Sequence, residues 1–159
     1  MNRPIFRMTV QGVSRPKGSL RPITNKRTGK TLMIPQGKHS KPWQNKVSQA
    51  AQLRRRGDLC EDTPLIVHLE FYFARPKSHY GTGRNEGMLK ADAPDFPITR
   101  STGDVDKLSR LVLDALQGIV YKDDSQVVTL FARCFYAIDE EPYMDVEIFV
   151  KKMLTDICA

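Results

Sequence analysis

The most regular hydrophobic pattern in the chain lies within residues 103–126. Its apolar side chains recur at the i, i+3, i+4, i+7 spacing of a single helix face, at Leu108, Leu111, Val112, Ala115 and Leu116. Asp106, Arg110 and Gln117 fall on the opposite, polar face. This pattern predicts an amphipathic helix, which Gly118 ends in the manner of a C-terminal cap.

Alternation of apolar and polar residues predicts the strands. It is clearest at 64–74, where one face carries Leu65, Val67, Leu69, Phe71 and Phe73. Residues 4–11, 126–137 and 142–152 alternate in the same way. A short turn joins the last two segments, which predicts that they pair as antiparallel neighbours.

A second helix is predicted from Ser40 to Arg56, with an inner face made by Trp43, Val47, Ala50, Ala51 and Leu53. Two long connections remain. Residues 12–38 form a basic loop that has room for a short hairpin, and residues 75–103 form a loop that is either functional or disordered in its middle. The predicted order, β-loop-α-β-loop-α-β-β, is that of an α+β fold with helices packed on a mixed sheet.

Length and composition predict the number of domains and the cellular compartment. A chain of 159 residues with 40% hydrophobic residues predicts one soluble domain over 1–159. No apolar run is long enough to span a bilayer and no signal peptide is evident, so we expect no membrane association. Cys60, Cys134 and Cys158 lack metal-type spacing, which favours free thiols in the cytoplasm.

Charge is divided unevenly along the chain. Residues 1–56 hold 14 of the 25 Lys and Arg residues and no Asp or Glu, whereas residues 57–159 hold the other 11 and all 18 acids. A basic segment of this kind predicts contact with a polyanion such as nucleic acid. The candidate phosphate contacts in the two loops are Lys17, Arg21, Lys26, Arg27, Lys30, Arg75, Lys77 and His79. Thr24 stands where a P-loop needs glycine, which excludes that motif at Gly29-Lys30-Thr31.

Acidic residues bracket the central helix. Asp104 and Asp106 can converge on one point if Asp104 is still extended, and a third carboxylate can come from either Asp123 or Asp124. Carboxylates in such a cluster suit Mg²⁺, which retains open positions for water and phosphate oxygens. The alternative is that these acids only cap the helix and form an ordinary turn.

The central stretch resembles the RusA family of Holliday junction resolvases of bacteria and phages. The matching residues are Asp104-Val-Asp106-Lys107-Leu108-Ser-Arg110, then Asp114-Ala115-Leu116, then Asp123-Asp124-Ser125-Gln126. The order of elements is also similar to that family, and Arg15-Pro16-Lys17-Gly18 and Arg75-Pro76-Lys77-Ser78-His79 are similar to longer phage members.

The resemblance implies a homodimeric, Mg²⁺-dependent endonuclease, with Mn²⁺ as a substitute, that cuts four-way DNA junctions by paired nicks. It implies metal-binding and catalytic roles for Asp104, Asp106 and Asp124, and it places the family's essential lysine at Arg110. Lys107 replaces the usual Asn and joins the candidate DNA contacts. Arg110 keeps the positive charge but cannot transfer a proton at neutral pH.

Three further expectations complete the prediction. Asp114 orients Arg110, Asp123 is either a turn residue or a support for the metal ligands, and Leu113, apolar on the polar face, belongs to the dimer interface. The alternative role of Arg110 is an i, i+4 ion pair with Asp106 or Asp114. Two other functions stay open from the residues alone. One is a non-catalytic DNA-binding protein of the same fold, and the other is a nuclease with a broader preference for branched DNA.

Overall fold

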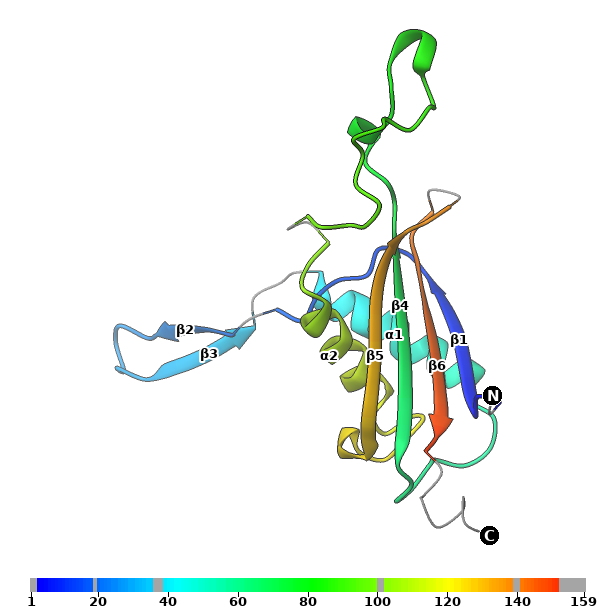
Figure 1. The fold of residues 1–159 in the computed structure, drawn as a ribbon. Helices are drawn as coiled ribbons and strands as arrows, with labels where there is room; N and C mark the ends of the chain where they lie inside the picture. The colour runs from blue at the N-terminus through cyan, green and yellow to red at the C-terminus, as the bar shows by residue number, and fades with distance from the viewer. Residues whose placement is uncertain (1–2, 19, 36–38, 100–101, 139–140, 152–159) are drawn as a thin grey trace.

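The computed structural model describes residues 3–18, 20–35, 39–99, 102–138 and 141–151 of the chain. Four strands form the main sheet in the order β1-β6-β4-β5. They are β1 (Phe6–Gln11), β4 (Leu65–Phe73), β5 (Val127–Tyr136) and β6 (Tyr143–Val150). Helices α1 (Ser40–Arg54) and α2 (Val105–Leu116) lie on one side of this sheet (Figure 1). The predicted α+β class with helices on a mixed sheet is confirmed.

The pairing of the last two strands differs from the prediction. β5 runs parallel to β4, β6 runs antiparallel to β4, and β4 lies between them, so the predicted β5–β6 pair is wrong. The physical reason is that β4 is a buried strand, with five inward side chains at most 4% exposed, so the backbone N–H and C=O groups on both of its edges need partners, which β5 and β6 supply. The turn after β5 therefore crosses one strand, a span of about 10 Å.

The predicted core face of α2 is confirmed. Its five apolar side chains (Leu108, Leu111, Val112, Ala115 and Leu116) are at most 2% exposed. Leu113 is half-buried and packs against the same core. The reason given for placing it in a dimer interface, an apolar residue on a polar face, was therefore wrong.

Helix α1 buries Trp43, Val47 and Ala51, as predicted, but Leu53 is 90% exposed. At about 100° per residue Leu53 lies more than a quarter turn from the centre of that stripe. Arg54 falls in line with it instead, and its Nε lies 3.4 Å from the carbonyl oxygen of Arg7 on β1.

Both long connections are structured in the described residues. The first contains the hairpin of β2 (Leu20–Thr24) and β3 (Thr31–Pro35), which projects from the body of the molecule (Figure 1). The second contains two 3₁₀ turns, η1 (Lys77–His79) and η2 (Gly83–Asn85), and folds back on itself where Gly81 donates to the carbonyl of Met88. The alternative of disorder in its middle is therefore not supported. No helix in the described ranges is long and apolar enough to cross a membrane.

Candidate active site

Asp104 occupies the N-cap position of α2 in an extended conformation, with φ −80° and ψ 134°. This is the conformation that the sequence argument required for convergence with Asp106. Its carboxylate makes no capping hydrogen bond to the helix. It pairs instead with the ammonium of Lys107, whose Nζ lies 2.8 Å from Asp104 Oδ2. The alternative in which Asp104 serves only as a cap is therefore not what the structure shows.

Asp106 lies in the first turn of α2 and is exposed. The hydrogen bond that Lys107 donates to Asp104 raises the pKa of Lys107, and the charges of Asp104 and Asp106 add to the effect. Both carboxylates therefore act on one ammonium group. The two carboxylates at the start of α2 create a local negative charge that favours a cation, and here that cation is the ammonium group of Lys107.

The structure distinguishes Asp123 from Asp124 at the far end of the site. Asp123 caps the 3₁₀ turn η3 (Asp124–Gln126): Ser125 N donates to its Oδ1 at 2.9 Å, and Gln117 Nε2 donates to its Oδ2 at 3.1 Å. Hydrogen bonds from Ser125 lower the pKa of Asp123. Asp124 is exposed; its backbone carbonyl accepts from the N–H of Val127, but its carboxylate has no hydrogen bond or ion pair with the described residues. Asp123 is thus the turn residue, as predicted, and Asp124 has its carboxylate available.

Gln126 fixes this turn through both ends of its amide. Its Oε1 accepts from the backbone N–H groups of Lys122 and Asp123, each at 3.0 Å. Its Nε2 donates to the carbonyl oxygens of Cys60 and Thr63, each at 3.2 Å. One side chain therefore ties the segment that carries Asp124 to the loop before β4. The Asp123-x-x-Gln126 spacing is that of a capping box and signals the bond to Asp123, whereas the bonds to Cys60 and Thr63 have no local signal in the sequence.

Tyr121 lies under the site, fully buried, and its hydroxyl donates to the carbonyl of Leu113 at 2.9 Å. Burial raises the pKa of this phenol, and the carboxylates of Asp124 and Asp114 raise it further. Asp124 and Asp114 therefore lie within electrostatic range of the same ring. The sequence analysis assigned no role to Tyr121.

Asp114 does not orient Arg110, and that prediction is wrong. The carboxylate of Asp114 forms an ion pair with Lys17, and the backbone N–H of Lys17 donates to the carbonyl of Lys107 at 3.0 Å. Pro16 lies so close to Gly103 that a Cβ there would stand 2.8 Å from the proline ring. The segment before β2 is thus held along α2. Arg110 is exposed, and no described carboxylate pairs with it.

The family resemblance implies Mg²⁺, and the donors at this site suit it in part. Carboxylates suit the ion, and one or two are enough when water and phosphate supply the rest. The exposed pair of Asp104 and Asp106 fits this requirement. Among the described residues no group of three or more His, Cys, Asp or Glu is close enough to hold a metal. The addition of Asp124 to the pair therefore stays a prediction.

The predicted DNA contacts fall into two groups. Lys26, Arg27 and Lys30 are exposed in and beside the turn of the β2–β3 hairpin, and Lys77 is exposed in η1. Three others have partners within the chain: Lys17 pairs with Asp114, Lys107 pairs with Asp104, and Arg75 stacks 4.1 Å over the ring of Tyr136. His79 is half-buried with its edge against the same ring, and the side chain of Arg21 lies outside the described part of the chain.

The open face of the sheet carries charge that is already paired. Glu70 accepts from Arg133 on β5 and from Tyr72, so its carboxylate is engaged in a cross-strand pair. His68 is half-buried between Phe131 and Phe149 and is structural.

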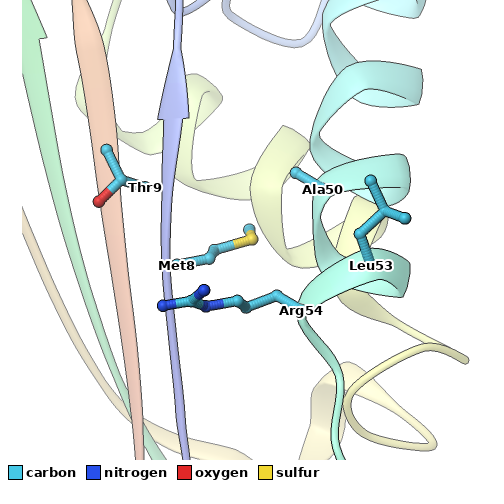
Figure 2. A pocket seen from close by; sticks show the side chains of 5 residues that line it. All are labelled: Met8, Thr9, Ala50, Leu53 and Arg54. Carbon is cyan, nitrogen blue, oxygen red and sulfur yellow. The ribbon is translucent and has the colours of Figure 1, made fainter.

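A hollow of about 420 Å³ lies between β1 and α1 (Figure 2). It is lined by Met8, Thr9, Ala50, Leu53 and Arg54. Met8 and Arg54 reach toward each other across it, whereas Thr9 points to the other side of β1. None of the candidate site residues lines this hollow, so it does not define the site.

The fold is α+β with two exposed carboxylates at the start of α2, and comparison with known proteins gives the family. A family model described as Endodeoxyribonuclease RusA matches residues 14–149. The chain therefore belongs to the RusA endodeoxyribonuclease family, as its motif predicted. It is also 33% identical over 139 residues to the uncharacterized protein YqaN of Bacillus subtilis (strain 168), an alignment that covers 84% of this chain and 85% of that protein.

Proposed function

We propose that this protein is a Mg²⁺-dependent endonuclease of the cytoplasm that resolves four-way DNA junctions by paired hydrolysis of phosphodiester bonds. Family membership supports the nuclease activity. One observation supports the assignment of the site. Asp104 is extended and its carboxylate makes no capping hydrogen bond, and Asp106 is exposed two positions further on.

In this proposal Asp104, Asp106 and Asp124 are the residues that would hold the metal. When bound, the ion would supply Lewis-acid chemistry: activation of a water molecule and neutralisation of phosphate charge. Arg110, one turn after Asp106, is free of internal partners among the described residues and binds a non-bridging phosphate oxygen. Asp123 and Gln126 hold the turn that presents Asp124.

The partner in solution is proposed to be a second copy of the chain. A two-fold dimer carries two equivalent sites, which matches the near two-fold symmetry of a four-way junction. Sedimentation or light scattering tests this directly, and a monomer at the concentrations used for cleavage would contradict it. A substitution at Leu113 would not test the dimer interface, because Leu113 packs against the core and its replacement would disturb the fold.

The deciding experiment is cleavage of a labelled four-way junction by wild type, Asp106→Asn and Asp58→Asn, with Mg²⁺ or with chelator. Asp58 is an exposed acid outside the site and serves as the matched control. Paired, symmetric nicks from wild type and Asp58→Asn, only with metal, are expected. Cleavage by Asp106→Asn at the wild-type rate would contradict the site.

Two rival functions give different results in the same assay. A non-catalytic DNA-binding protein binds the junction without cutting it in Mg²⁺ or Mn²⁺. This rival is favoured by the Lys107–Asp104 pair, in which an internal cation already occupies one proposed metal ligand. A nuclease of broader preference cuts flaps and three-way forks as fast as four-way junctions.

A further inference from the structure

The β2–β3 hairpin is a two-stranded ribbon that projects from the domain (Figure 1). Its turn is defined by hydrogen bonds: Asn25 N donates to the carbonyl of Lys30 and Gly29 N donates to the carbonyl of Asn25, each at 2.9 Å. Asn25 Oδ1 also accepts from Arg27 N at 2.9 Å. The projecting segment therefore has a specific shape.

Large apolar side chains stand exposed on both faces of this ribbon. Ile23, 47% exposed, is opposite Leu32, 64% exposed, and Met33 on the other face is 55% exposed. An isolated two-stranded ribbon is marginal in water and gains stability by packing against something. The fold leaves these three side chains uncovered, which indicates a surface that is completed by a partner.

The charge of the ribbon indicates the chemistry of that partner. Lys26, Arg27 and Lys30 surround the turn, all are exposed, and no described acid pairs with them. The whole segment of residues 1–56 contains no Asp or Glu. A partner that offers anionic groups beside apolar surface fits such a ribbon. DNA does so, because phosphates flank a groove floored by base edges and thymine methyl groups.

The base of the ribbon is fixed to the proposed site. Lys17, three positions before β2, is bound to α2 through its backbone and its ammonium group, and Pro16 is packed on Gly103 beside Asp104. A strand of five residues extends about 17 Å, roughly the rise of five base pairs. The ribbon is therefore long enough to reach the duplex that adjoins a phosphate bound through a metal at the proposed site.

We propose that the β2–β3 hairpin is an arm that enters a groove of the DNA next to the cleavage site. Lys26, Arg27 and Lys30 contact phosphates, while Ile23, Leu32 and Met33 pack against the floor and walls of the groove. The major groove, about 12 Å wide, admits a two-stranded ribbon. The inference rests on the proposed function only in that the chain must bind DNA.

The test is binding of a labelled four-way junction in chelator, over a series of salt concentrations, so that cleavage does not interfere. One variant, Ile23→Thr/Leu32→Thr/Met33→Thr, removes apolar surface with a residue that favours strands. A second, Lys26→Gln/Arg27→Gln/Lys30→Gln, removes the charges. Leu53→Gln, at the exposed apolar position of α1, is the matched control.

The apolar variant is expected to bind at least about tenfold more weakly with the same salt dependence. The charge variant is expected to reduce the slope of log affinity against log salt by roughly 2.7, about 0.9 for each lost phosphate contact. Leu53→Gln is expected to match wild type. The single change Leu32→Thr, at the most exposed of the three positions, gives a smaller loss if the triple variant does not fold.

Four results would overturn the inference. Wild-type affinity in the apolar variant shows that these side chains do not touch DNA. A changed oligomeric state of that variant in light scattering assigns the apolar faces to a second copy of the chain. An unchanged salt slope in the charge variant removes the phosphate contacts. If wild type itself binds no DNA, the proposed function fails together with the arm.

Discussion

Gln126 offers the most direct test of how the fold positions the candidate site. In the change Gln126→Glu the acceptor Oε1 keeps its partners, but an oxygen replaces the Nε2 donor that faces the carbonyl oxygens of Cys60 and Thr63. Two hydrogen bonds are lost, each worth about 1 kcal/mol, and two carbonyls then face a carboxylate in a half-buried position. The expected loss of unfolding free energy is about 2–4 kcal/mol.

Urea unfolding at neutral pH measures this loss, and Gln52→Glu, an exposed amide on α1, is the control with an expected change within about 0.5 kcal/mol. In a chain of this size the expected drop in Tm is roughly 5–15 °C. The loosened turn also displaces Asp124, so we expect cleavage in saturating Mg²⁺ to slow in Gln126→Glu at a temperature where the variant is fully folded. Unchanged unfolding of Gln126→Glu would refute the proposal that its amide holds the turn.

Two further changes test the cation at the site and the buried phenol. Lys107→Asn removes the ammonium group beside Asp104, so we expect this variant to bind Mn²⁺ more tightly in calorimetry. Lys41→Asn on α1 is the control and is expected to match wild type. Equal Mn²⁺ affinity of Lys107→Asn and wild type would contradict competition between Lys107 and the metal for Asp104. Tyr121→Phe removes the bond to the carbonyl of Leu113 and is expected to cost about 1 kcal/mol in chemical unfolding. Because burial raises the pKa of Tyr121 above its ordinary 10.0, wild-type stability is fully present below pH 10 and falls as pH rises further. Tyr121→Phe should show a smaller alkaline loss, and an identical slope would contradict the assignment.

The local hydrophobic pattern was enough to predict the helices and strands, but not which strands pair with one another. The stripe of α2 and the alternation of β4 were predicted correctly because each reports which face of one element is buried. The pairing of β5 with β6 was wrong because strand order depends on which strand needs cover on both edges. That requirement concerns the whole sheet, and a turn six residues long does not reveal it.

The candidate site divides in the same way. Asp104 and Asp106 could be singled out from sequence because the N-terminus of a helix determines where both carboxylates lie. The ion pair of Lys17 with Asp114 joins residues 97 positions apart, and the sequence suggested Arg110 as the nearer partner. A salt bridge between such distant residues is decided by the path of the basic segment along α2, which no local periodicity encodes.

These ion pairs change how the acids of α2 should be understood. Asp104, Asp106 and Asp114 would repel one another along one helix, and Lys107 and Lys17 offset that repulsion without any metal. In the proposed site, a divalent ion at Asp104 and Asp106 would compete with the ammonium group of Lys107 for the carboxylate of Asp104. Because the Lys107–Asp104 pair is exposed, this competition is modest. If an ion took the place of the ammonium group, the charge of Lys107 would be free for a phosphate of the DNA. We therefore expect a lysine at this position to lower metal affinity and to raise DNA affinity.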